Sequence, residues 1–161
     1  MAKSGGPTVA SNDRTLIIVK PDGVQRGLIG EIISRLERRG LKFVGMKLIT
    51  MSRELAEEHY AGLKDKPFYP KLVDYITSAP VVVGVVEGPS AFQTVRDTIG
   101  ATDPLKAAPG TVRFEFGISI GRNLIHASDG DESAVREINL FFSPDELSSW
   151  PRTTDTWIIE E

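Results

Sequence analysis

Short runs of β-branched residues alternate along this chain with segments of helical periodicity, and their order leaves few folds open. Such runs predict buried strands at residues 15–19, 41–51, 80–87 and 123–126. Apolar residues at helical spacing, several with Ser or Pro before them or Gly after, predict helices at residues 28–39, 52–63, 68–76, 89–100 and 132–142. If the second and third helices form an insertion, the remaining order is β-α-β followed by β-α-β. We therefore predict an α+β fold of the ferredoxin-like (split βαβ) type, with a four-stranded, mainly antiparallel sheet, helices on one face and an inserted helical pair.

The length of the chain, 161 residues, suits a single domain. Residues 1–13 are rich in small and polar residues, so we expect a disordered tail there and a folded domain over residues 14–161. The longest apolar run, residues 81–86, is far shorter than the ~20 residues that a membrane helix requires. We therefore expect a cytoplasmic protein with no membrane partner.

Charge and cysteine content exclude several classes of function. The net charge of -3 does not supply the basic surface that nucleic-acid binding needs, so nucleic acid is not expected as the main partner. The absence of cysteine excludes disulfides, thiolate nucleophiles and cysteine zinc sites. The chain also has no G-x-x-x-x-G-K-[ST] loop and no G-x-G-x-x-G fingerprint. Any phosphate site must therefore be built locally from separate residues.

The segment at residues 100–121 gives conflicting signals. Val112, Phe114, Phe116, Ile118 and Ile120 alternate with polar residues or glycine, which is typical of a strand. The first half of the segment is rich in turn residues, and connections of this length in compact domains are usually functional. Periodicity therefore predicts a strand, whereas composition indicates a loop.

The chain contains two histidines, the residues best suited to nucleophilic or acid-base chemistry near neutral pH. His59 follows Glu57 and Glu58, so we interpret it as a solvated helix residue. His126 ends an apolar run and precedes small polar residues, which predicts a position where a strand gives way to a loop. On this pattern alone, His126 could equally be a histidine without function.

A carboxylate and several cations could complete a site around His126. Glu137 lies at the border of the buried stripe of its helix and could hydrogen-bond one ring nitrogen, leaving the other free as a nucleophile. The alternative is an exposed glutamate paired with a lysine or arginine. Cationic residues near predicted strand ends could converge on phosphate: Lys20, Arg96, Arg113 and Arg122. Each could also be a surface charge.

Two stretches resemble the most diagnostic motifs of the nucleoside diphosphate kinases: Lys20-Pro-Asp-Gly-Val-Gln-Arg-Gly-Leu-Ile-Gly30 and Asn123-Leu-Ile-His-Ala-Ser-Asp129. Shorter matches follow the family's order and spacing at residues 59–60, 66–68, 100–104 and 109–113, and the resemblance extends from residue 14 to about residue 160. In this family a histidine takes the γ-phosphate of a nucleoside triphosphate and passes it to a nucleoside diphosphate in a ping-pong cycle.

The resemblance implies a role for each matched residue. His126 would carry the phosphate, Glu137 would orient it, and Ser128 would assist. The residues that would hold phosphates and ribose are Lys20, Tyr60, Arg96, Thr102, Arg113 and Asn123. Phe68 and Leu72 would pack against the flat side of the base, which predicts broad base specificity. Mg²⁺ would bridge the nucleotide phosphates, with Asp129 nearby through water. Family precedent also favours a homo-oligomer, a hexamer or a tetramer.

Two departures from the family pattern bear on these expectations. The family usually has Gly-Asp after the arginine, where this chain has Phe114-Glu115, and its His-Gly-Ser-Asp appears as His126-Ala-Ser-Asp129. Glycine can adopt backbone conformations that phenylalanine cannot, so Phe114 could displace Arg113 or alter a subunit contact. Family precedent makes residues 100–121 a loop over the nucleotide, and we follow it.

Two other functions compete with phosphoryl transfer. Gly117-Ile-Ser119-Ile-Gly121 matches the nucleophile elbow of serine hydrolases, but that motif needs a strand-turn-helix context and an acid between serine and histidine. Ferredoxin-like domains also serve as non-catalytic binding modules. The combination of Lys20, Arg96, Arg113, Asn123, His126 and Glu137 favours an enzyme over such a module.

Overall fold

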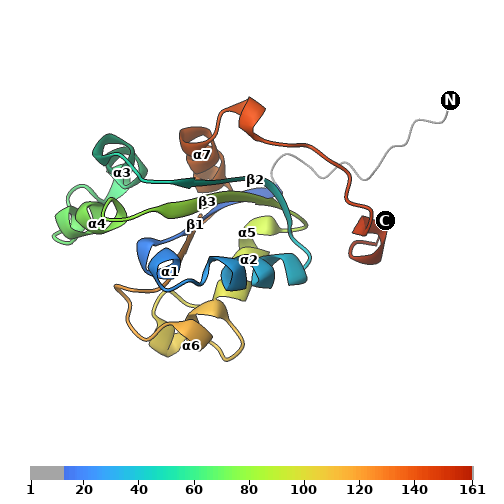
Figure 1. Ribbon diagram of the computed structural model, residues 1–161, viewed down its shortest axis with the longest axis horizontal. Coiled ribbons are helices and arrows are strands. Elements are labelled where there is room, and N and C mark those ends of the chain that lie inside the picture. Colours follow the sequence, from blue (N-terminus) through green and yellow to red (C-terminus); the bar gives the residue numbers. More distant parts are fainter. Residues whose placement is uncertain (1–12, 161) are drawn as a thin grey trace.

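The computed structural model describes residues 13–160 and contains a four-stranded antiparallel sheet in the order β2-β3-β1-β4 (Figure 1). The strands are β1 (Arg14–Val19), β2 (Lys42–Ile49), β3 (Val81–Glu87) and β4 (Ile125–Ala127). The central pair, β1 and β3, is buried along almost its whole length, as their β-branched runs predict. The predicted ferredoxin-like α+β fold is confirmed. The predicted tail at residues 1–13 lies outside the described residues except for Asp13.

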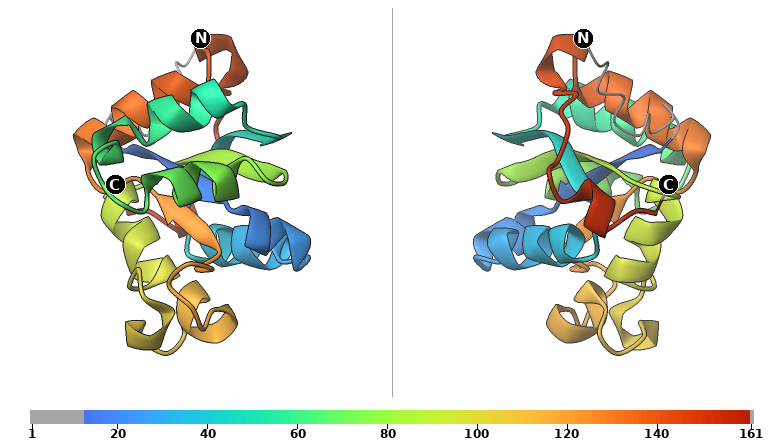
Figure 2. Two further views of the ribbon diagram at one scale, coloured as in Figure 1. Left: turned by 90° about the vertical axis from the view of Figure 1, so that its left-hand side faces the viewer. Right: turned by 90° about the vertical axis from the view of Figure 1, so that its right-hand side faces the viewer.

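Helices cover both faces of the sheet, whereas we expected them on one face. The helices are α1 (Pro21–Gln25), α2 (Ile29–Arg38), α3 (Arg53–His59), α4 (Tyr69–Ile76), α5 (Ala91–Ile99), α6 (Val112–Phe116) and α7 (Asp131–Phe141). Figures 1 and 2 show α3 and α7 on one side of the sheet and α2 on the other. Each side has its own core, because successive residues of a strand point to opposite faces. Leu16 and Ile18 join the core under α3, α4 and α7, while Ile17 and Val19 join the core under α2 and α5.

Local capping signals predicted several helix boundaries. Ser52 accepts a hydrogen bond from the Leu55 amide at 3.1 Å and so caps α3. Ser143 and Glu146 form a capping box around a short 3₁₀ turn. Pro89 was expected at the first position of its helix, but α5 begins two residues later at Ala91. The residue before it, Ser90, has a left-handed backbone with φ of 48°, which postpones the first helical turn.

The strand predicted by alternation at residues 112–120 does not form. Residues 112–116 form α6, and only an isolated bridge between Ser119 and Arg122 follows. Thr111 caps α6 by accepting a hydrogen bond from the Phe114 amide at 3.4 Å. The loop expected from family precedent is therefore the better description, although it contains this helical turn and the 3₁₀ turn at Pro104–Lys106.

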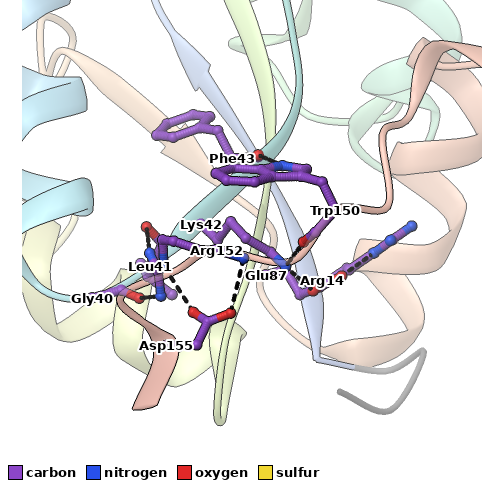
Figure 3. Close-up of polar contacts among 9 residues, drawn as sticks. All are labelled: Arg14, Gly40, Leu41, Lys42, Phe43, Glu87, Trp150, Arg152 and Asp155. Atoms are coloured by element: carbon purple, nitrogen blue, oxygen red, sulfur yellow. Dashed lines mark hydrogen bonds and ion pairs between the residues drawn. The ribbon is translucent and has the colours of Figure 1, made fainter. Parts of the chain in front are cut away.

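The C-terminal segment lies across the beginning of β2 and is fixed there by polar contacts (Figure 3). Arg152 forms an ion pair with Asp155 at 2.8 Å and donates to the carbonyls of Gly40 at 2.8 Å and Leu41 at 3.2 Å. Trp150 Nε1 donates to the Phe43 carbonyl at 3.0 Å. These contacts fix residues 150–155 far from β4. No helix within residues 13–160 is long and apolar enough to cross a membrane.

Candidate active site

His126 lies on the short edge strand β4, where the sheet meets α7. Its Nε2 lies 2.5 Å from Oε1 of Glu137, and 23% of the His126 side chain is exposed. Glu137 is 2% exposed because Ala134, Ile138 and Phe141 place the same face of α7 against the sheet. An ionised carboxylate can only accept, so Nε2 carries the proton and the lone pair lies on Nδ1.

Glu137 is held ionised despite its burial. Desolvation alone would raise the pKa of Glu137, but the hydrogen bond with His126 holds that pKa below its usual value. A carboxylate that stays negative beside the ring can stabilise positive charge that develops there. This arrangement suits a histidine that acts as a nucleophile through Nδ1.

The interpretation of His59 as a solvated residue is wrong. His59 is 5% exposed, and its Nδ1 lies 3.6 Å from the same Glu137 oxygen that binds His126. Its ring meets that of His126 edge to face, with centroids 4.8 Å apart. Burial, and then the charge of His126, lower the pKa of His59 to about 3, so its ring is neutral at physiological pH. The charged neighbours Glu57 and Glu58 occupy the outer face of α3, while Ala56 and His59 occupy the inner face.

Three of the four predicted cations converge on a cavity beside His126. Lys20 follows β1, Arg96 belongs to α5 and Arg113 belongs to α6, and all three line the cavity. Arg122 does not line it, and its guanidinium lies 4.1 Å from the ring centroid of Tyr75. The positive charge of the cavity is thus supplied by three separate segments, in place of a single glycine-rich loop.

Burial perturbs two of these cations. Desolvation, with the nearby charge of Arg113, lowers the pKa of Lys20 to about 8. Desolvation, with the charge of Arg96, lowers the pKa of Arg113 to about 10. Mutual repulsion among buried cations is relieved when an anion binds between them. The perturbations therefore favour a site for a polyanion such as phosphate.

Asn123 and Arg113 hold the wall of the cavity through backbone and side-chain contacts. Lys20 Nζ donates to Asn123 Oδ1 at 2.8 Å, and Asn123 Nδ2 donates to the Thr102 carbonyl at 2.9 Å. Arg113 donates to the carbonyls of Asn123 and Gly100 at 3.2 Å and 3.0 Å, and to that of Ile125 at 2.5 Å. The loop at residues 100–116 is thereby tied to the entry of β4.

The cavity has a volume of about 500 Å³, enough for a nucleotide's phosphates and sugar. It is lined by Lys20, His59, Tyr60, Gly62, Leu63, Arg96, Thr102, Arg113, Asn123, His126, Ala127, Asp129, Ser133, Arg136 and Glu137. Phe68 and Leu72 are not among these residues. Phe68 precedes α4 and is 51% exposed, so its ring is free to meet a ligand outside the cavity.

Ser128 is fully buried next to β4, and its hydroxyl makes no hydrogen bond within the part of the chain described here. Sequence reasoning did not single out Gly62, Leu63, Ser133 or Arg136, all of which line the cavity. Arg136 directly precedes Glu137, so its position beside the predicted carboxylate could have indicated that Arg136 lines the cavity. Gly62 and Leu63 follow Tyr60 directly and could have been found in the same way.

Asp129 and Glu137 are the only carboxylates that line the cavity among the described residues. Glu137 is engaged by His126, whereas Asp129 is exposed and accepts a hydrogen bond from Ser133 at 2.5 Å. One exposed carboxylate cannot form an all-protein magnesium cage. It does fit a Mg²⁺ ion that is held chiefly by nucleotide phosphates and water.

Phe114 does not disturb Arg113. It lies in the right-handed helix α6 with its ring 48% exposed, and the non-glycine residues with positive φ in the described chain are Ser90 and Leu124. A glycine is therefore not required at this position. Glu115, the other residue of this departure, forms an ion pair with Arg35 of α2.

Ser119 lies in an exposed turn that follows α6 and forms the bridge to Arg122. A nucleophile elbow places its serine between a buried strand and a helix. The local structure at Ser119 does not match that arrangement, so the hydrolase alternative loses its structural basis.

Comparisons with known proteins agree with this geometry. A family model described as nucleoside diphosphate kinase matches residues 13–147. Curated relatives named nucleoside diphosphate kinase include proteins from Archaeoglobus fulgidus, 58% identical over 149 residues, and Carboxydothermus hydrogenoformans, 60% identical over 148 residues. Each alignment covers 92% of this chain and 99% of the relative. A halophilic nucleoside diphosphate kinase from Halobacterium salinarum, solved in complex with CDP, is 53% identical with a TM-score of 0.89, and covers 91% of this chain and 98% of its own.

Proposed function

Because the chain belongs to the nucleoside diphosphate kinase family and is thus an enzyme of nucleotide phosphotransfer, we propose that it works by a ping-pong cycle through a phosphohistidine on His126. The γ-phosphate of a nucleoside triphosphate passes to His126 and then to a nucleoside diphosphate, with broad base specificity. The observation that carries this proposal is the contact between His126 Nε2 and Glu137, which leaves Nδ1 as the nitrogen with a lone pair beside three cations.

In the first half of the cycle, the Nδ1 lone pair of His126 attacks the γ-phosphorus of the donor. A nitrogen–phosphorus bond forms as the bond from the γ-phosphorus to the bridging oxygen breaks, and its electron pair leaves with the nucleoside diphosphate. The imidazole ring becomes more positive because Nε2 keeps its proton. Glu137, ionised and within hydrogen-bonding distance, stabilises that charge.

In the second half, a terminal phosphate oxygen of the acceptor attacks the phosphorus on His126, and the electron pair returns to Nδ1. Lys20, Arg96 and Arg113 neutralise the charge on the phosphoryl oxygens in both directions. Asn123 and Thr102 lie on the same wall and are placed to bind phosphate or ribose, and Tyr60 lines the cavity beside His59. Ser128 is buried next to His126, and its nearby hydroxyl assists Glu137 by helping to lower the pKa of that carboxylate.

Base recognition on this proposal is apolar and therefore tolerant. Phe68 and Leu72 lie one helical turn apart at the start of α4, and neither side chain can read a base edge by hydrogen bonding. The related halobacterial enzyme was solved with CDP, which supports binding of a pyrimidine nucleotide here as well. We expect purine and pyrimidine diphosphates to accept phosphate at similar rates.

Asp129 would hold Mg²⁺ through water, and the ion would supply positive charge that neutralises the nucleotide phosphates. A homo-oligomer, either a hexamer or a tetramer, and a cytoplasmic location complete the proposal. Family membership supports the oligomer and favours the hexamer.

The decisive experiment incubates the purified protein with γ-³²P-ATP and Mg²⁺ without an acceptor. We expect an acid-labile, alkali-stable phosphoprotein that discharges to both ADP and CDP. His126→Ala should abolish the label with the fold intact by circular dichroism. Ser119→Ala serves as the matched control and should label normally, because Ser119 lies outside the cavity.

Substantial transfer by His126→Ala would remove His126 from its role. Loss of label in Ser119→Ala alone would revive the hydrolase alternative. If the unaltered protein binds nucleotide but never becomes labelled, a non-catalytic binding role would replace the proposed mechanism.

A further inference from the structure

Leu124, two residues before His126, holds an unusual backbone conformation. Its φ is 75°, in the left-handed region that leucine rarely adopts, and its side chain is fully buried. The Ile125 amide donates to the Asn123 carbonyl at 2.9 Å, so residues 123–125 form a three-residue turn. A turn of this kind with positive φ is rare and strained, and it persists only when surrounding contacts fix it.

Both peptide groups of Leu124 are fixed by residues just after β1, namely Lys20 and, within α1, Asp22. The Leu124 amide donates to Asp22 Oδ2 at 3.0 Å, and the Lys20 amide donates to the Leu124 carbonyl at 2.8 Å. Asp22 therefore supplies the one side chain that binds the strained residue's amide. Asp22 does not itself line the cavity.

The conformation of Leu124 sets the relation between the two polar residues beside it. Asn123 precedes the turn and directs its amide toward Lys20 and Thr102, while His126 follows the turn on β4. Rotation of the backbone at Leu124 would move one of these side chains relative to the other. The turn thus fixes the spacing between the phosphate-binding wall and the histidine.

Asp22 is held in turn by Tyr75 of α4. The Tyr75 hydroxyl donates to Asp22 Oδ1, and the Asp22 amide donates to the same hydroxyl at 3.1 Å. The Arg122 guanidinium covers the Tyr75 ring on the side of the turn at residues 119–122. Tyr75 lies three residues after Leu72, so the helix that would carry the base contact is tied to the entry of the catalytic strand.

We propose that Asp22 is a positioning residue for the phosphoryl transfer proposed above: its carboxylate holds Leu124 in the left-handed turn that places Asn123 and His126 around the γ-phosphate. Tyr75 fixes that carboxylate and links it to α4. The inference rests on the proposed function for its kinetic consequences, and on the hydrogen bonds alone for its structural part.

Tyr75→Phe tests the link with the removal of one oxygen atom. We expect the rate of ³²P labelling at saturating ATP to fall about tenfold, as loss of about 1.4 kcal/mol of positioning would produce, while KM changes less than about threefold. Tyr69→Phe is the matched control on the same helix. The Tyr69 hydroxyl is buried and makes no hydrogen bond within residues 13–160, so this variant should label at the unaltered rate.

Asp22→Ala and Asp22→Asn separate positioning from general stability. Asp22→Ala leaves the Leu124 amide without its acceptor and should slow labelling by about a hundredfold, whereas the amide oxygen in Asp22→Asn can still accept and should restore most of the rate. The charge change gives a second signature. Lys20 faces Asp22 on α1, Arg113 on α6 and His59 on α3, and Asp22 is the neighbour that raises the pKa of Lys20. The alkaline limb of the pH profile should therefore move to lower pH in Asp22→Asn and stay in place in Tyr75→Phe.

Amide hydrogen exchange at Leu124 keeps the inference separate from the proposed function. Exchange should accelerate in Tyr75→Phe and in Asp22→Ala, and stay unchanged in Tyr69→Phe, whether or not the protein becomes labelled. Failure of the unaltered protein to label would contradict the phosphohistidine cycle. Unaltered exchange at Leu124 in Tyr75→Phe and Asp22→Ala, or an unaltered saturating rate in both, would overturn the positioning role.

Discussion

Replacing Glu137 with glutamine removes the negative charge beside His126 and preserves the shape of the side chain. Glu137 Oε1 lies 2.5 Å from His126 Nε2 and 3.6 Å from His59 Nδ1, in a position that is 2% exposed. An amide oxygen can still accept from Nε2, so the tautomer of His126 should persist in Glu137→Gln. The variant therefore isolates the effect of charge from the effect of orientation.

The expected loss follows from the two kinds of hydrogen bond. A bond to a charged group contributes about 1.5–3 kcal/mol and a neutral bond about 0.5–1.5 kcal/mol, so the variant loses roughly 1–2 kcal/mol as the ring becomes positive. That difference corresponds to a labelling rate about 5- to 30-fold lower at saturating ATP. Folding stability should fall less, because the variant also escapes the cost of burying a charge.

Rapid-quench measurement of the labelling rate tests this prediction, with thermal unfolding as the control. The pKa of Glu137 is lowered in the folded state, so its contribution to stability is present above the unfolded pKa of about 4.3 and is lost as pH falls through the folded value. Glu137→Gln should not show that loss of folding stability at acid pH. An unchanged labelling rate would show that His126 needs no negative partner and would refute the electrostatic role.

Three further predictions concern the walls of the cavity. The pKa of Lys20 is lowered from 10.5 to about 8, so kcat/KM should fall as pH rises through about 8. Between about pH 8 and 10.5 folding stability should rise with pH, because the unfolded chain still binds the proton that folded Lys20 has lost. Flat profiles of both kcat/KM and stability would contradict this prediction. Arg113→Lys keeps the charge but cannot bind three carbonyls at once, so denaturant unfolding should show a loss of about 2–4 kcal/mol. Phe114→Gly should leave the labelling rate within about twofold of the unaltered rate. It should cost about 1 kcal/mol of stability, because glycine has a low helix propensity. A large gain in rate would show that Phe114 does obstruct the site.

Much of the fold was predictable because its signals are local. The β-branched runs of β1 and β3, the cap at Ser52 and the capping box at Ser143 each depend on residues a few positions apart. His126 and Glu137 were predictable as a pair because His126 lies at the end of an apolar run and Glu137 borders the buried stripe of its helix. The cations were candidates from the residues alone, and the family resemblance implied roles for Lys20, Arg96 and Arg113 but not for Arg122. Their meeting point depends on the tertiary fold.

The failures arose where tertiary contacts outweigh local pattern. His59 lies next to two glutamates in sequence, yet the packing of α3 against α7 buries it beside Glu137. The alternation at residues 112–120 is typical of a strand, but Arg113 is satisfied by carbonyls of residues 100, 123 and 125 only when residues 112–116 are helical. No periodicity argument contains that information, because the carbonyls belong to distant segments.

Arg113 explains how the proposed phosphate site forms without a glycine-rich loop. Its guanidinium binds the carbonyls on either side of Leu124, so the same group that supplies positive charge also supports the strained turn before His126. Glu137, in contrast, supports no backbone and acts on the ring alone. Substitutions at Arg113 should therefore lower stability and activity together, whereas Glu137→Gln should lower activity with little change in stability. That contrast separates the residues that hold the cavity together from Glu137, which stabilises positive charge on His126.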